Sequence, residues 1–241
     1  MKESDQGKTK AVNILISSAS LFIALLILPP LIIIKLPQYF FARFSALNVY
    51  DNFPGLNHAF LNSKFQEILM FVHNSNADFD ISFFSVKDYL HMLDVSQLTI
   101  YAHLVLIIAL ITFLLNLLAN KSKALVMIKT SVHYLLALFF VLAIITSLLF
   151  RQLFIIFHQI SFSNDYWLLD PKRSMLIRFL PEEVFEEIVV ISILSTISLL
   201  VIIYFFVILR LQWIKKLQNK KKNFNYWWTL NTGTCCNFRI T

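Results

Sequence analysis

The stretch IVVISILSTISLLVIIYFFVIL, residues 188–209, decides the fold class, because it runs for 22 residues without a charged side chain. A helix that crosses the hydrocarbon core of a bilayer needs about 20 such residues. Working outward from this stretch, residues 11–34 and 98–119 are likewise uncharged, and residues 124–150 carry only Lys129, close enough to one end to lie at the interface. The sequence therefore predicts an α-helical integral membrane protein, built as a four-transmembrane-helix bundle.

The composition agrees with this prediction. Of the 241 residues, 58% are hydrophobic and only 15% are charged, and the mean hydropathy is +0.69. A soluble domain carries about 25% charged residues, so that class is excluded. Only 3 glycines leave little material for phosphate-binding loops, and the two adjacent cysteines, Cys235 and Cys236, fit neither a disulfide framework nor a four-ligand zinc site.

The charges divide unequally between the two sides of the predicted bundle. One side carries 13 basic and 2 acidic residues, whereas the two loops on the other side carry 8 basic and 12 acidic residues. By the positive-inside rule, both termini lie in the cytoplasm of a multi-pass cell-membrane protein. The predicted segments are a cytoplasmic N-terminus 1–10, spans 11–34, 98–119, 124–150 and 188–209, extracytoplasmic loops 35–97 and 151–187, a cytoplasmic turn 120–123 and a basic cytoplasmic tail 210–241.

The basic tail raises the question of a nucleic-acid partner. Its lysines, between residues 215 and 222, follow the fourth span directly, where anionic lipid headgroups attract such clusters. We therefore expect membrane lipids rather than nucleic acid as neighbours. Residues 223–241 are interpreted as an interfacial or poorly ordered extension, with no assigned role.

The first outer loop is expected to form part of a small extracytoplasmic cap with some β-structure. Apolar and polar residues alternate from Asp78 to Phe84, which is typical of a strand on an apolar surface. A short helix is expected to follow, with Ser85 as its N-cap and Asp88 completing a capping box. Asp88, His91 and Asp94 recur every three residues and so lie close to one face. Alternatively, Asp94 is the N-cap of the second span.

The second outer loop contains several helix signals. Residues 154–162 either extend the third helix or form a strand. Asp170 followed by Pro171 is a favourable helix start. Pro181, with two glutamates after it, is expected to open the fourth helix.

Two histidines stand out as candidates for chemistry. His91 and His158 each adjoin an apolar segment on the outer side, with acidic residues nearby in the sequence. A neutral imidazole in such a place can act as a general base or acid. The other four histidines are interpreted as packed or ordinary loop side chains.

Two motifs resemble the lipoprotein intramolecular transacylase family. The first is His91-Met92-Leu93-Asp94-Val95, just before the second span. The second runs from Phe157-His158 through Asn164-Asp165-Tyr166-Trp167-Leu168-Leu169-Asp170-Pro171 to Leu176-Ile177 and Pro181. The similarity covers residues 11–211 in the number, order and orientation of the spans. One departure lies at Arg173-Ser174-Met175, where the resemblance leads us to expect an acid.

The resemblance implies acyl transfer within one diacylglyceryl-modified bacterial lipoprotein. The sn-2 acyl chain would move from the glyceryl group onto the α-amine of the N-terminal cysteine, giving a lyso-form product, with no cofactor and no metal. It further implies that His91 and His158 are the catalytic pair in an extracytoplasmic site. We expect His158 to be the main base with His91 as its partner, or the reverse, and Asp94 and Asp165 to orient the histidines. Trp167 and Asp170 complete the expected site as supporting residues.

Two other interpretations stay open on the sequence alone. In a metal-dependent membrane hydrolase, the ligands would be His91, Asp94, His158 and Asp165, although no His-Glu-x-x-His motif is present. In a non-enzymatic membrane assembly or sensor protein, neither histidine would matter. The sequence does not specify the oligomeric state.

Overall fold

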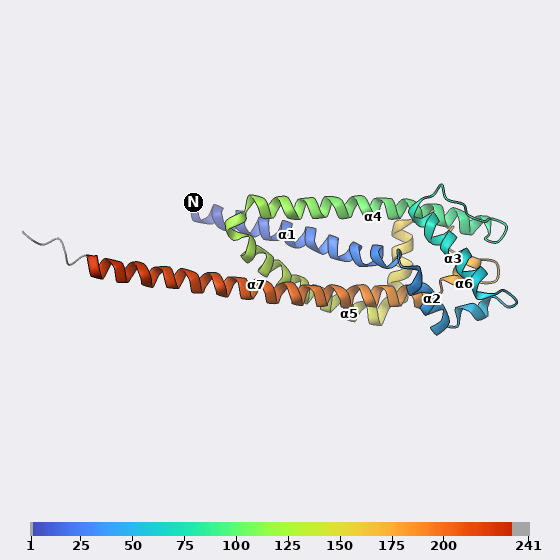
Figure 1. Ribbon diagram of the computed structural model, residues 1–241. Helices are drawn as coiled ribbons and strands as arrows, with labels where there is room; N and C mark the ends of the chain where they lie inside the picture. Colours follow the sequence, from blue (N-terminus) through green and yellow to red (C-terminus); the bar gives the residue numbers. More distant parts are fainter. Residues whose placement is uncertain (1, 233–241) are drawn as a thin grey trace, which may run out of the picture.

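The computed structural model describes residues 2–232, and side chains within residues 7–227. Four helices in this range are long and apolar enough to cross a membrane. They are α1 (Lys2–Ile33), α4 (Val86–Ala119), α5 (Ala124–Ser161) and α7 (Glu182–Thr232). They form one elongated bundle, in which α1 packs along α4 and α5 packs along α7 (Figure 1). The predicted helical membrane bundle is confirmed.

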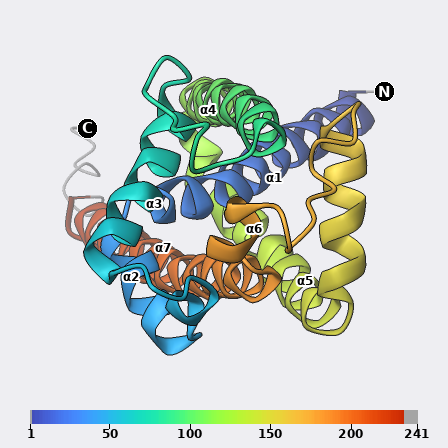
Figure 2. The same ribbon diagram turned by 90° about the vertical axis from the view of Figure 1, so that its right-hand side faces the viewer.

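The shorter elements gather at one end of the bundle and form a cap (Figures 1 and 2). They are α2 (Pro37–Ala46), the 3₁₀ turn η1 (Val49–Asn52), α3 (His58–His73) and α6 (Met175–Phe179). A second 3₁₀ turn, η2 (Lys121–Lys123), joins α4 to α5 at the opposite end.

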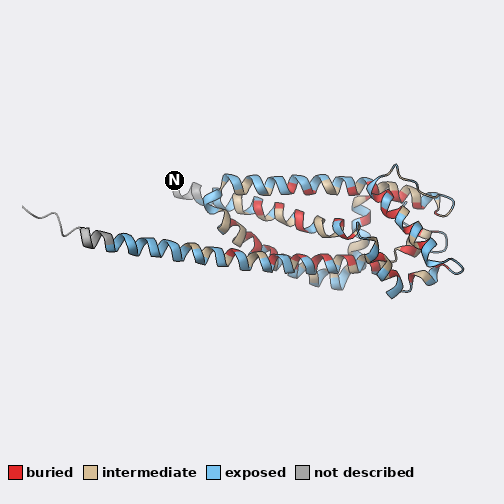
Figure 3. Cartoon of the chain, in the orientation of Figure 1, coloured by how far each residue is buried: buried red, intermediate tan, exposed pale blue. Residues whose placement is uncertain are grey.

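Buried side chains follow the inner faces of the four long helices, and their outward faces are exposed (Figure 3). Many of those exposed residues are large and apolar, among them Leu115, Phe140 and Phe206. In water such a surface would be unfavourable, but lipid tails cover it in a membrane. The cap differs, because many of its apolar residues are buried in a core that also includes Met92 of α4 and Val184 of α7.

Phenylalanines dominate the core of the cap. Phe44, Phe65 and Phe179 are fully buried, and their ring centroids lie 4.7–6.0 Å apart. Because Phe179 belongs to α6 and the other two to α2 and α3, this core joins the two outer loops. Arg43 of α2 also forms an ion pair with Glu187 in the first turns of α7.

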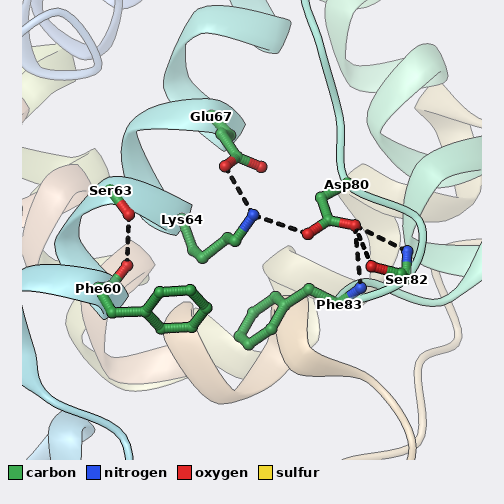
Figure 4. Close-up of polar contacts among 7 residues, drawn as sticks. All are labelled: Phe60, Ser63, Lys64, Glu67, Asp80, Ser82 and Phe83. Atoms are coloured by element: carbon green, nitrogen blue, oxygen red, sulfur yellow. Dashed lines mark hydrogen bonds and ion pairs between the residues drawn. The ribbon is translucent and has the colours of Figure 1, made fainter.

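An ionic cluster attaches the segment before α4 to α3 (Figure 4). Lys64 Nζ lies 2.8 Å from Glu67 Oε1 and 2.7 Å from Asp80 Oδ2. The ammonium group of Lys64 holds the pKa of the Asp80 carboxyl well below its usual range. The other oxygen of Asp80 accepts hydrogen bonds from the backbone N–H groups of Ser82 and Phe83.

The strand expected from Asp78 to Phe84 is wrong, and the part of the chain described by the structure contains no strand. Asp80 caps a turn there, and Ile81 is 60% exposed whereas Phe84 is buried. The alternation of apolar residues therefore reflects a turn that places phenylalanines in the cap core. The Asx-type hydrogen bonds of Asp80 explain why the turn is preferred.

Two of the four helix starts expected from the sequence are confirmed. Ser85 and Asp88 form the predicted capping box of α4, and α7 begins directly after Pro181. Asp94 is not an N-cap, because α4 runs without interruption from Val86. No helix starts at Asp170, which opens a turn; Ser174 caps α6 instead.

Two helices are longer than the apolar stretches that predicted them. α5 continues to Ser161, so residues 154–162 extend a helix. α7 continues to Thr232, so the first part of the tail, interpreted as an interfacial or poorly ordered extension, is helical. The cysteines at 235 and 236 lie outside the described residues. Where the membrane boundaries fall along these helices stays a prediction.

Candidate functional site

A break in α5 brings the second candidate histidine to the first. Leu149 has non-helical backbone angles, φ −130° and ψ 23°. Beyond it the last turns of α5 cross the end of the bundle toward α4 (Figures 1 and 2). His158 thereby reaches His91 near the start of α4, with 6.1 Å between the two ring centroids. Both histidines are buried, with exposed fractions of 9% for His158 and 8% for His91.

His158 has a defined hydrogen-bonding arrangement. Its Nδ1 lies 2.7 Å from the backbone oxygen of Phe154, one turn earlier in α5. A carbonyl oxygen can only accept, so Nδ1 carries the hydrogen, and in the neutral ring Nε2 keeps its lone pair. The indole of Trp167 lies 5.2 Å away between centroids, and Phe154 lies 4.3 Å away. The ring is thus held in place with one basic nitrogen available.

His91 is packed but unpartnered. Its ring meets Phe162 edge to face, with centroids 5.2 Å apart. Its Nδ1 is buried and has no hydrogen-bond partner within the described residues. Buried polar atoms are satisfied in the large majority of cases, so this nitrogen is an exception that a bound molecule could satisfy.

Three polar contacts attach the outer end of α4 to the second outer loop, on both sides of His91 along the helix. They run from Lys87 Nζ to the Leu168 oxygen (2.6 Å), from Ser174 Oγ to Asp88 Oδ1, and from Asn164 Nδ2 to Asp94 Oδ2 (2.9 Å). The loop that carries Trp167 is therefore fixed over the histidine pair.

Asp88 is the buried centre of these contacts. Its side chain is fully buried, and its two oxygens accept from the backbone N–H of Ser85 and from the hydroxyl of Ser174. Ser174 also caps α6 by accepting from the Ile177 N–H. This serine belongs to the segment Arg173-Ser174-Met175, in which the family resemblance leads us to expect an acid. Its hydroxyl donates to the carboxylate of Asp88 and caps the helix at the same time.

The structure brings together only some of the residues expected from the sequence. His158 lies beside both His91 and Trp167, and Asp94 is bonded through Asn164 to the loop that carries Trp167. Neither Asp94 nor Asp165 is hydrogen-bonded to a histidine in the described part of the chain.

Asp165 and Asp170 are both exposed. The carboxylate of Asp170 accepts from the Lys172 N–H, and its backbone oxygen accepts from the Ser174 N–H. It therefore shapes the turn before Ser174 and lies outside the contacts of the histidines.

Sequence reasoning did not assign a site role to Asp88, Asn164 or Ser174. A signal existed for two of them, because Asp88 belongs to a capping box and Ser174 lies in the segment that departs from the family pattern. The pairing between them depends on tertiary structure, which no local pattern specifies.

The donors of a metal site are not assembled. Among the described residues, no group of three histidine, cysteine, aspartate or glutamate side chains is placed to hold a metal ion. The four ligands suggested for a metal-dependent hydrolase are thus not brought together, since Asp165 faces solvent.

Comparison with known proteins places this geometry in context. The family model described as lipoprotein intramolecular transacylase Lit matches residues 15–185. No curated protein matches the chain in sequence.

Solved structures share the fold. In meso structures of the membrane integral lipoprotein intramolecular transacylase Lit from Bacillus cereus are 19% identical in sequence. One has a TM-score of 0.67, with 86% of this chain and 99% of that chain covered. Two histidine variants of the same protein, to arginine and to alanine, have TM-scores of 0.68 and cover 88% of this chain and 97% and 99% of theirs. The family match spans well over half of the sequence, and the chain therefore belongs to the lipoprotein intramolecular transacylases, which are membrane-integral acyltransferases that modify lipoproteins.

Proposed function

We propose that this acyltransferase moves the sn-2 acyl chain of a diacylglyceryl-cysteine lipoprotein onto the α-amine of the same cysteine, with His91 and His158 as the catalytic pair. The buried, closely spaced imidazoles are the observation that carries the proposal. The amine nitrogen attacks the ester carbonyl, a C–N bond forms and the C–O bond to glycerol breaks. One proton passes from the amine to the glycerol oxygen.

The tautomer of His158 supports its role as the base. An α-amine has a pKa of about 7.7–8.0, so at neutral pH most of it is protonated and cannot attack. Nε2 of His158 can accept a proton from the amine, because Nδ1 is committed to the Phe154 oxygen. His91, whose Nδ1 has no partner within the described residues, is placed to donate its ring hydrogen to the leaving glycerol oxygen. The proton taken up by His158 then passes to His91, so that both rings end neutral. Such general acid–base catalysis contributes about 10²–10⁴-fold.

Positioning supplies a second contribution. Nucleophile and ester belong to one molecule, so the enzyme only has to hold them in a reactive geometry, and no external acyl donor is needed. In this proposal Trp167 packs against the base, and Asp94 and Asp170 keep the loop that carries Trp167 in place. No contact of Asp165 supports an orienting role for it.

The proposed orientation places the histidine pair on the extracytoplasmic side. The cap and both outer loops lie at one end of the bundle, and the N-terminus and the extended end of α7 lie at the other (Figure 1). The unequal charge of these two ends supports cytoplasmic termini. Lipoproteins with a free N-terminal cysteine would then meet the histidines at the outer surface.

Expression in a bacterium that accumulates diacylglyceryl lipoproteins with free α-amines tests the proposal. Mass spectrometry of the N-terminal lipopeptide should show one acyl chain on nitrogen and one on glycerol. His91→Ala and His158→Ala should abolish this product. His73→Ala is the matched control, because its Nδ1 also bonds a carbonyl one turn earlier but lies on α3. Full conversion by either site variant would refute the catalytic pair, and release of a free fatty acid without N-acylation would indicate a hydrolase.

A further inference from the structure

The extension of α7 beyond its apolar stretch carries a concentration of positive charge that acyl transfer does not explain. Six basic residues, here called the basic collar, lie between residues 210 and 222, and no acidic residue follows Glu187. They are Arg210, Lys215, Lys216, Lys220, Lys221 and Lys222. All six are exposed on a continuous helix that projects past the rest of the bundle (Figures 1 and 3).

The collar surrounds the helix. At about 100° per residue, Lys216 lies about 100° from the direction of Lys215, Lys220 about 140° and Lys221 about 240°, whereas Lys222 returns to within about 20° of Lys215. A protein or nucleic acid that docks on a helix contacts one side of it. Lipid headgroups surround a helix that leaves the membrane. The distribution of charge therefore favours a membrane surface over a macromolecular partner.

An aromatic side chain marks the level of that surface. The guanidinium of Arg210 lies over the ring of Trp213, 4.4 Å from its centroid. Tryptophan is enriched at membrane–water interfaces. At a rise of about 1.5 Å per residue, Lys215 and Lys216 follow Arg210 by about 8–9 Å, and Lys221 and Lys222 by about 17–18 Å. Electrostatic attraction to a charged surface decays over about 8 Å at physiological salt.

We propose that the basic collar binds the anionic phospholipid headgroups of the leaflet at this end of the bundle, with Arg210, Lys215 and Lys216 contributing most. Lysines near the start of α1 and in η2 lie at the same end and are exposed as well. The collar adds a charged ring at the end of the fourth span. It keeps anionic lipid around α7 and fixes the depth at which this helix leaves the membrane.

Electron paramagnetic resonance of the full chain in lipid vesicles tests this proposal. Spin-labelled phosphatidylglycerol and phosphatidylcholine would report the relative association of each lipid with the whole protein. The double variant Lys215→Gln/Lys216→Gln should lower the preference for phosphatidylglycerol several-fold. Lys221→Gln/Lys222→Gln removes the same charge farther from the surface and should have the smaller effect. Lys215→Arg/Lys216→Arg should keep the preference, and high salt should weaken it.

Two results would overturn the proposal. One is an equal preference of the unaltered chain for the two lipids. The other is an equal loss of the preference for phosphatidylglycerol in the near and far double variants. A bilayer surface attracts the nearer lysines more strongly, whereas a soluble polyanion would bind both pairs alike. Mass spectrometry of the lipopeptide product, run in parallel, tests acyl transfer separately, so failure of either idea leaves the other measurable.

Discussion

The two outer loops of this acyltransferase are stabilised in different ways. The first loop supplies most of the apolar core of the cap, which also includes Phe179 of the second loop. The second loop, between Ser161 and Met175, is largely exposed and is attached to α4 by the three polar contacts that flank His91. The comparison indicates that the first loop supports the stability of the cap, whereas the second positions the groups around the histidines. Substitutions in the two loops should therefore separate stability from activity.

The largest effect is expected in the first loop. Phe65→Ala removes a fully buried ring that packs against Phe40, Phe44 and Phe179. Such truncations cost about 3–5 kcal/mol, so thermal unfolding of the purified protein should occur at a much lower temperature. Ile81→Ala, at an exposed position of the same cap, should unfold like the unaltered protein. A normal unfolding temperature for Phe65→Ala would contradict the apolar core as the source of stability.

A smaller loss of stability, with a larger loss of activity, is expected at Ser174. Ser174→Ala leaves one oxygen of the buried Asp88 carboxylate unpaired and removes the cap of α6, at a cost of about 1–3 kcal/mol. Lipopeptide conversion per folded molecule should fall, because the loop over His158 is no longer fixed at this end. Ser163→Ala, an exposed serine of the same loop, is the matched control. Unaltered conversion in both variants would show that the Asp88 contact does not position the site.

Positions 164 and 165 are neighbours in the second loop, but only Asn164 is hydrogen-bonded to α4, so substitutions at the two positions test whether that contact matters. Asn164→Ala breaks the bond to Asp94 and should slow conversion, with little change in unfolding temperature. Asp165→Asn should slow conversion less, since its exposed carboxylate makes no side-chain hydrogen bond in the described structure. Initial rates of lipopeptide conversion measure both. The reverse order would restore the orienting role that the sequence assigned to Asp165.

The smallest effect is expected on the stability of the fold at low pH. The pKa of Asp80 in the folded protein lies below its unfolded value, so its ion pair with Lys64 stabilises the fold most above the unfolded pKa of about 3.9. This contribution is lost progressively as the pH falls below that value. Asp80→Asn should consequently show a shallower decline of unfolding temperature in acid than the unaltered protein. Parallel declines would mean that the cluster in Figure 4 does not contribute to acid stability.

Local signals explain what could be predicted from the sequence. Long uncharged stretches, the capping box at Ser85 and the proline before α7 act within a few residues, and all three are confirmed. Between Asp78 and Phe84 the same kind of pattern was misleading, because one aspartate that caps a turn outweighed the alternation of apolar residues.

The site itself depends on features that no local signal contains. His91 and His158 could be selected from two motifs, but their proximity requires the break in α5 at Leu149. Helix kinks normally occur at proline, glycine or inserted polar groups, and residues 148–150 are Leu-Leu-Phe. The hydroxyls of Thr146 and Ser147 bond to backbone oxygens about one turn earlier, which bends helices but does not by itself specify where one breaks. The link between Asp88 and Ser174 likewise joins distant parts of the chain.

The break at Leu149 also divides the control of where His158 lies. Because α5 turns there and crosses the bundle, the residues before Leu149 set how high the crossing segment sits, at about 1.5 Å for each residue. The residues after Leu149 set the azimuth of the imidazole, since one inserted residue would rotate it by about 100°. A residue added before Leu149 would also turn the whole crossing segment by about 100° about the axis of this helix. A change of bilayer thickness therefore keeps His158 beside His91 only when it is matched by whole helical turns of about 5.4 Å before the break.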